Sequence, residues 1–224
     1  MWFHPAIVLG FFAAAVSTPV AAAGAQPLLK MRTEGSTRHL GVPPRQVVDV
    51  IMGSLEKDDI AVMDDCLEDL KLKPRDYRHL LRSAVFRPSP GHALHFVRAS
   101  GASCSGWYGA HSFQYYLVDE SFLGGRRKYR IVFEGRGDSF AVYARISHGL
   151  NEIEASGCIA IECRNARMAF DGRQYRPILC SRTTFDRNRE TTEPRPCGSD
   201  DWRDDQSSGF ARAPVRAERR ARAG

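Results

Sequence analysis

The sequence predicts an α+β fold, in which a short N-terminal helical bundle is followed by an antiparallel β-sheet stabilised by disulfides. Apolar residues recur at helical spacing between residues 44 and 86. After Gly91, β-branched and aromatic residues gather in short runs that glycine-containing turns separate. Helices that precede the strands, instead of alternating with them, argue against a parallel doubly wound sheet. All six cysteines lie beyond residue 65, after the predicted signal peptide.

The first 23 residues predict a cleaved signal peptide. Ala6 to Val16 form an apolar run of eleven residues, Pro19 follows, and the small residues Ala21 and Ala23 fit the cleavage rule. The run is too short for a permanent membrane-spanning helix, which needs about 20 residues. No Lys or Arg precedes Ala6, which departs from the usual leader and leaves open whether the first residue is assigned correctly. An uncleaved N-terminal anchor is the alternative.

Residues 24–43 are polar and rich in turn-forming types, which predicts a flexible lead-in. The helical region at 44–86 is expected to hold three helices. Apolar stripes at helical spacing predict the first helix over 47–55 and the second over 58–70. A third helix is expected over 74–85, because Pro74 suits a first helical turn and the prolines after Phe86 end the pattern.

An antiparallel β region is expected over residues 87–185. Gly124-Gly125 is expected to form a turn, and the alternating run 129–134 is expected to pair with 140–144 as a hairpin. Residues 186–224 are mostly polar and charged, with an Arg/Ala-rich stretch at 212–222, which predicts a disordered tail.

The Asp171-Gly172 pair predicts a two-residue hairpin turn and with it a disulfide. In such a hairpin Phe170 faces Arg173, and an unbroken ladder brings Cys163 opposite Cys180. Cross-strand neighbours at that spacing suit a disulfide. Pro177 conflicts with this register because it has no N–H for the ladder, and a bulge there would shift the pairing.

The remaining cysteines are left without assigned partners. The alternative to Cys163–Cys180 is a local bond between Cys158 and Cys163 across a four-residue loop. The other cysteines whose pairing stays open are Cys66, Cys104 and Cys197. An even number of cysteines behind a leader favours an oxidising compartment, here the periplasm or the exterior.

The basic net charge is first of all expected to favour solubility, and as a guide to partners it favours envelope surfaces over nucleic acid. The net charge is +6, and a basic exported protein meets anionic envelope surfaces first. The Arg-rich stretch 212–222 lacks the interleaved aromatics that stack on bases, so no nucleic acid is expected as a partner. For this basic tail, we expect at most a weak contact with anionic lipid surfaces.

The segment Cys104-Ser105-Gly106-Trp107 resembles the Cys-Ser-Gly-aromatic motif of the NlpC/P60 cell-wall cysteine peptidases. The resemblance covers four residues and implies Cys104 as the nucleophile, with His148 as its candidate base. The Asp that usually precedes the cysteine is Ser103, and the following run at 113–118 is typical of a strand, not of a helix. A disulfide-bonded Cys104 is the alternative.

The histidines predict no metal site and no cofactor. His92, His95 and His111, taken with Cys104, match no standard zinc spacing, so they are expected to be ordinary strand and loop residues.

A second resemblance lies in the β region. Ser147-His148-Gly149-Leu150-Asn151-Glu152-Ile153, followed by Phe170-Asp171-Gly172-Arg173-Gln174-Tyr175, resembles a pattern in small exported bacterial β-domains of uncharacterised function. The resemblance covers about thirty residues and implies a hairpin with a cysteine soon after it, here Cys180. Glu152 stands where an Asp is commoner, and the segment implies structure but no activity.

The sequence contains no convincing triad, metal cluster or phosphate loop. The expected function is therefore a non-catalytic binding or inhibitory module of the bacterial envelope, with an unidentified envelope ligand or protein as its partner. A cell-wall cysteine peptidase that uses Cys104 is the alternative.

Overall fold

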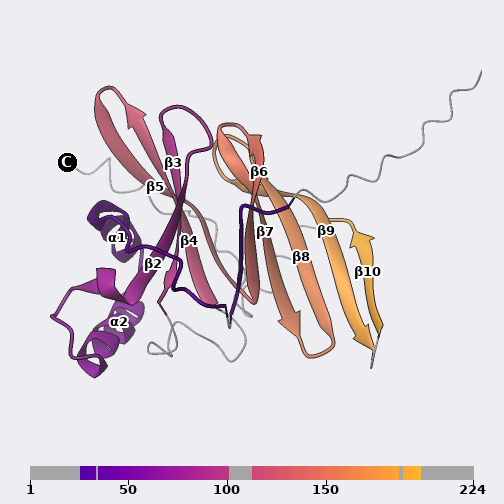
Figure 1. Ribbon diagram of the computed structural model, residues 1–224, viewed down its shortest axis with the longest axis horizontal. Helices are drawn as coiled ribbons and strands as arrows, with labels where there is room; N and C mark the ends of the chain where they lie inside the picture. Colours follow the sequence, from indigo (N-terminus) through magenta and orange to yellow (C-terminus); the bar gives the residue numbers. More distant parts are fainter. Residues whose placement is uncertain (1–25, 34, 101–112, 187–188, 198–224) are drawn as a thin grey trace, which may run out of the picture.

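Two antiparallel sheets pack against each other, and two short helices cover the outer face of the smaller sheet (Figure 1). The computed structural model describes residues 26–33, 35–100, 113–186 and 189–197. The four-stranded sheet has the order β2-β3-β4-β5, and the six-stranded sheet has the order β1-β6-β7-β8-β9-β10. The smaller sheet is thus the middle of three layers.

The helical elements all precede the strands of the smaller sheet along the chain. The helical elements are α1 (Arg45–Met52), α2 (Lys57–Asp69) and the 3₁₀ turn η1 (Tyr77–Leu80). The strands of the smaller sheet are β2 (Leu81–Phe86), β3 (His92–Ala99), β4 (Phe113–Leu123) and β5 (Arg126–Gly137). The strands of the larger sheet are β1 (Leu29–Arg32), β6 (Ser139–Ser147), β7 (Leu150–Ile159), β8 (Glu162–Phe170), β9 (Tyr175–Asp186) and β10 (Arg189–Arg195).

Aromatic side chains fill the space between the two sheets. Phe140 of β6 stacks on Phe96 of β3 with ring centroids 4.9 Å apart, and its centroid lies 4.7 Å from that of Tyr115 in β4. All three side chains are buried. Burial of such large apolar surfaces is the main force that holds one sheet on the other.

A second core joins the helices to the smaller sheet. Ile51 of α1 and Met63 of α2 are fully buried in one cluster with Val97 of β3 and Val118 of β4. The smaller sheet is therefore covered on both faces, which explains why six consecutive residues of β3, from Leu94 to Ala99, are all buried.

Within the expected helical bundle at 44–86, the prediction of a third helix over 74–85 is wrong. Only Tyr77–Leu80 forms a helical turn, and Leu81–Phe86 is strand β2, paired with β3. Leu81 and Val85 match helical spacing, but Leu81 and Ser83 also alternate as a strand does, and pairing with the buried β3 decides the outcome. The helices form a layer on a sheet and not a bundle of their own.

The expected hairpin between 129–134 and 140–144 is also wrong. Strand β5 pairs with β4 across the predicted Gly124-Gly125 turn, whereas β6 belongs to the other sheet. The chain changes sheets at Gly137, where a Cβ atom would lie 2.5 Å from the carbonyl oxygen of Ser156. The N–H of Asp138 donates to the same carbonyl oxygen at 2.8 Å, so the crossing is tightly packed.

The disulfides of the larger sheet differ from the predicted Cys163–Cys180 bond. Cys158 is bonded to Cys163 across the β7–β8 hairpin, as in the alternative pairing, and Cys180 is bonded to Cys197. No free thiol occurs among the described cysteines, and Cys66 is disulfide-bonded as well.

Two shifts in the β8–β9 ladder explain the error. Phe170 pairs with Tyr175, not Arg173, because the Asp171 carboxylate accepts the N–H groups of Arg173 and Gln174, both at 2.8 Å, and closes a longer loop. The register shifts once more at Pro177, which lacks a ladder N–H. Cys163 consequently lies opposite Thr183, and Cys180 lies opposite Ala166.

Both ends of the described chain are more ordered than expected. Within the expected flexible lead-in, β1 pairs with β6 and buries Leu29 and Met31. Within the expected disordered tail, β10 pairs with β9 over 189–195. The predicted signal peptide and residues 198–224 lie outside the described residues. No helix in the described ranges has the length and apolarity to cross a lipid bilayer.

Candidate ligand site

A cavity of about 860 Å³ opens at one end of the smaller sheet. Its walls come from the end of β2, the β2–β3 loop, the start of β3, the end of β4 and the start of β5, and Pro44 before α1 completes it. The loop Arg87–Gly91 contains Pro88 and Pro90, whose fixed φ angles limit the conformations of this rim. The cavity is therefore built mainly on strand ends and a restrained loop.

A histidine, a carboxylate and an arginine form a chain of contacts in the cavity wall. The Nε2 atom of His95 lies 2.9 Å from Oε2 of Glu120, and Nη1 of Arg127 lies 3.0 Å from Oε1 of the same carboxylate. The β3–β4 register places His95 opposite Val118, so Glu120 is its diagonal neighbour on the same face. The His95 side chain is 3% exposed, that of Glu120 is 17% exposed, and that of Arg127 reaches into solvent.

The second ring nitrogen of His95 has no hydrogen-bond partner among the described residues. This Nδ1 atom is buried, and buried polar atoms in folded proteins are nearly always paired. A contact between Nε2–H and the Glu120 carboxylate leaves Nδ1 of a neutral imidazole as an acceptor. The Nδ1 atom of His95 is therefore a buried acceptor, in a residue of the cavity wall, that lacks a donor among the described residues.

A second histidine–carboxylate pair lies beside the first, on the other face of the sheet. His92 Nδ1 is 2.8 Å from Oδ1 of Asp119, and Asp119 is buried towards the six-stranded sheet. Burial, and next the charge of Asp119, raise the pKa of the Tyr175 hydroxyl, which donates to the carbonyl oxygen of Asn151.

His92 and His95 are three residues apart on one strand, so their side chains leave it on opposite faces. They do not converge on one metal ion. No group of three metal-ligating side chains occurs in the part of the chain that the structure describes.

The lining combines positive charge with apolar surface. The lining contains Arg87 and Arg127 but a single carboxylate, that of Glu120, which is already paired with His95 and Arg127. Val85 and Phe122 are 43% and 60% exposed, which is high for large apolar side chains beside a cavity. The site can therefore hold a ligand that carries an anionic group, a hydrogen-bond donor and an apolar part.

The Glu120–His95 pair has the arrangement of an oriented general base, but the described lining supplies no nucleophile to it. The hydroxyl of Ser89 donates to the carbonyl oxygen of Gly149 at 2.9 Å instead. Within the described residues, the hydrogen bonds of His95 go to Glu120 alone. The described residues thus place an oriented histidine–carboxylate pair at the cavity, without a described nucleophile in contact with it.

Of the two peptidase residues predicted from the sequence, His148 is not part of the cavity lining. Cys104 lies outside the described residues. His148 lies in the β6–β7 turn with φ at +47°, and its Nδ1 atom lies 2.9 Å from the carbonyl oxygen of Phe170. This contact ties two turns together, which is a structural role.

The residues of the second resemblance also make structural contacts. The side-chain amide of Asn151 donates to the carbonyl oxygen of Tyr143 at 2.7 Å. Glu152, buried on the outer face of the larger sheet, accepts from Arg167 at 2.9 Å and lies 3.0 Å from Nε of Arg145. These contacts join β6, β7 and β8 at a point where the β6–β7 ladder is irregular.

Sequence reasoning named His95 but missed its partners Glu120 and Arg127. Two signals were present: an ionisable residue inside the apolar run Leu94–Val97, and two adjacent acids, Asp119 and Glu120, closing the aromatic run of β4. Neither signal gives a site without the register that pairs the two strands.

Comparison with known proteins found no matching family model, no matching curated protein and no matching solved structure.

Proposed function

We propose that this chain is a non-catalytic binding module of the bacterial envelope and that the cavity at His95 is its ligand site. The observation that supports this most directly is His95, a residue of the cavity wall whose buried Nδ1 atom has no partner among the described residues. An unpaired buried acceptor costs free energy, so a small side-chain adjustment that lets it accept a hydrogen bond from a ligand would favour binding.

The envelope location rests on the predicted leader and on the disulfides. Two bonds within the larger sheet, Cys158–Cys163 and Cys180–Cys197, fit a protein that matures in an oxidising compartment. The peptidase alternative rests on Cys104 and His148, and the contact between His148 and Phe170 gives it no support.

A small probe with all three ligand features tests the site. N-acetyl-L-leucine carries a carboxylate, an amide N–H and an apolar side chain, whereas N-acetyl-L-leucinamide lacks the charge. In amide NMR titrations of the oxidised protein, the acid is expected to shift resonances of Val85, Ala93 and Phe122, which line the cavity. Affinity in the millimolar range is expected for so small a ligand, about 4 kcal/mol. The amide is expected to bind several-fold more weakly.

A variant of His95, compared with a matched histidine control, tests whether binding of the acid depends on His95. His95→Gln is expected to weaken binding about tenfold, because a hydrogen bond at a buried site is lost or misaligned. His79→Gln removes an exposed histidine whose contact is to Asp76, and it is expected to leave binding unchanged. Absence of localised shifts with up to about 50 mM acid, or equal binding by both variants, would remove the basis for a ligand site at His95.

A further inference from the structure

The strand β2 has a free edge, and that edge forms one wall of the cavity. β2 is the outer strand of the four-stranded sheet, paired with β3 on one side. On its other side the structure records one isolated bridge, between Ser83 and Gly41, with N–H···O distances of 2.9 and 2.8 Å. Both hydrogen-bonding groups of Ser83 therefore point away from β3.

The backbone groups of Val85, two residues further along β2, point to the same side as those of Ser83. Residues two apart on an antiparallel strand direct their N–H and C=O groups to the same side, so those of Val85 also point to the free edge. Val85 lies opposite His95 in the β2–β3 register, at a pair that does not exchange ladder hydrogen bonds. No described residue pairs with the outward groups of Val85.

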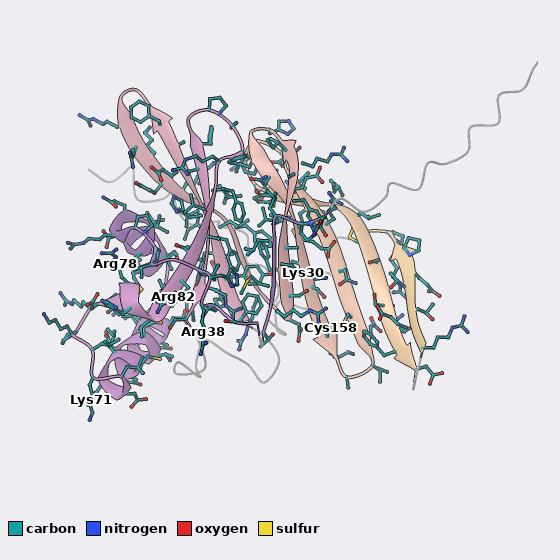
Figure 2. The ribbon with its side chains drawn as sticks, viewed as in Figure 1. Lys30, Arg38, Lys71, Arg78, Arg82 and Cys158 are labelled. Carbon is teal, nitrogen blue, oxygen red and sulfur yellow. A yellow bond between two sulfur atoms is a disulfide. The ribbon has the colours of Figure 1, made fainter. Side chains whose placement is uncertain are left out.

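The lead-in chain crosses this edge at Ser83. Leu40 is buried between the two sheets, and Pro44 lines the cavity on the helix side, so the chain passes from one face to the other around Gly41. Nε of Arg78 donates to the carbonyl oxygen of Pro43 at 3.2 Å and holds the chain after the crossing. Figure 2 shows Arg38, Arg78 and Arg82 on the side of the molecule that carries β2.

The cavity lies next to the open part of this edge. In a β-ladder, the side chain of a residue opposite Val85 would lie on the same face as Val85 and His95, which is the face of Glu120. Arg87, two residues further along and also in the cavity wall, favours an acidic side chain there. Positive charge predominates in the lining because Glu120 is already paired with His95 and Arg127.

Resting on the proposed binding function, we infer that the ligand is an acidic, extended peptide segment that adds to β2 as a further strand at Val85. Strand addition of this kind takes affinity from main-chain hydrogen bonds and specificity from a pocket beside the edge. The peptide would supply the donor for His95 and the anion for Arg87, and it would cover the exposed side chains of Val85 and Phe122.

A proline at the free edge tests the inference with little effect on the fold. Val85→Pro removes the outward N–H but no hydrogen bond of the β2–β3 ladder, and such edge positions tolerate proline. Val85→Ala is the matched control, since it shortens the side chain and keeps the N–H. Linear nonapeptides displayed on phage are selected on the wild-type protein, and the enriched sequences are synthesised for calorimetric titration.

The expected result is enrichment of Asp or Glu between β-branched residues, with binding at least about tenfold weaker to Val85→Pro than to Val85→Ala. N-methylation of the paired residue in the peptide is expected to cause a similar loss, which covers the case that the proline variant fails to fold. Enriched peptides that bind Val85→Pro as well as Val85→Ala would overturn strand addition. Failure to enrich any peptide, while N-acetyl-L-leucine still binds, would overturn the peptide ligand and leave a small acid as the occupant.

Discussion

The packing of one sheet on the other is expected to depend on Phe140. Its side chain is 1% exposed and contacts the rings of Phe96 and Tyr115 at centroid distances of 4.9 and 4.7 Å. Phe140→Ala removes a ring from the centre of this interface and leaves a cavity that three strands of fixed register cannot close. A cost of about 4 kcal/mol in the free energy of unfolding is expected.

The same cost corresponds to a measurable change in melting temperature. For a folded region of this size, 1 kcal/mol shifts the midpoint by about 2–4 °C, so a decrease of about 8–16 °C is expected. Unfolding of the oxidised protein in guanidinium chloride, followed by near-ultraviolet circular dichroism, measures the free energy directly. An unchanged slope with denaturant concentration shows that the native state, and not the compactness of the unfolded chain, has been altered.

Phe122→Ala is the matched control, because Phe122 is 60% exposed near the β4–β5 turn. A loss of no more than about 0.5 kcal/mol is expected there. If the two variants lost equal stability, Phe140 would not be at the centre of a two-sheet core, and the arrangement of the layers would have to be revised.

Two further predictions concern the β8–β9 loop and the cysteines. The backbone N–H groups of Gln174 and Arg173 lower the pKa of Asp171 from 3.8 to about 2. The folded state is stabilised by this effect in full above pH about 4, and the stabilisation is lost towards pH 2. Asp171→Asn is therefore expected to lose less stability than the wild type between these pH values, as measured by urea unfolding. Equal losses in the two proteins would contradict this. Cys66 is disulfide-bonded, and the two bonds of the larger sheet use four of the other five cysteines. A non-reducing peptide map is therefore expected to join the Cys66 and Cys104 peptides; a free Cys104 thiol that alkylates rapidly near neutral pH would instead favour the peptidase alternative.

Elements with strong local signals could be predicted from the sequence. The apolar stripes that begin at Val47 and Ile60 predicted α1 and α2, and Gly124-Gly125 predicted the turn between β4 and β5. In each case the residues that determine the structure lie within about ten positions of one another. Local propensity and the final fold then agree.

Errors arose wherever a distant partner decides the structure. Leu81 to Phe86 form a strand because β3 offers a buried edge, and β6 leaves β5 because Gly137 lets the chain approach Ser156 closely. The disulfide prediction failed on register, where a loop closed by the side chain of Asp171 and a shift at Pro177 moved Cys163 away from Cys180. Spacing alone does not contain these contacts.

The candidate site shows how much the register adds to the sequence pattern. Adjacent acids on one strand, Asp119 and Glu120, point to opposite faces, and so do histidines three apart on its neighbour. Once the strands are aligned, each face must receive one histidine and one carboxylate. On the inner face Asp119 is buried towards the larger sheet, and its partner His92 reaches the cavity wall. On the helix side His95 and Glu120 both line the cavity beside the free edge of β2. Two pairs of the same chemistry therefore differ through position alone: the carboxylate of the first is turned into the core between the sheets, and that of the second is turned to the cavity.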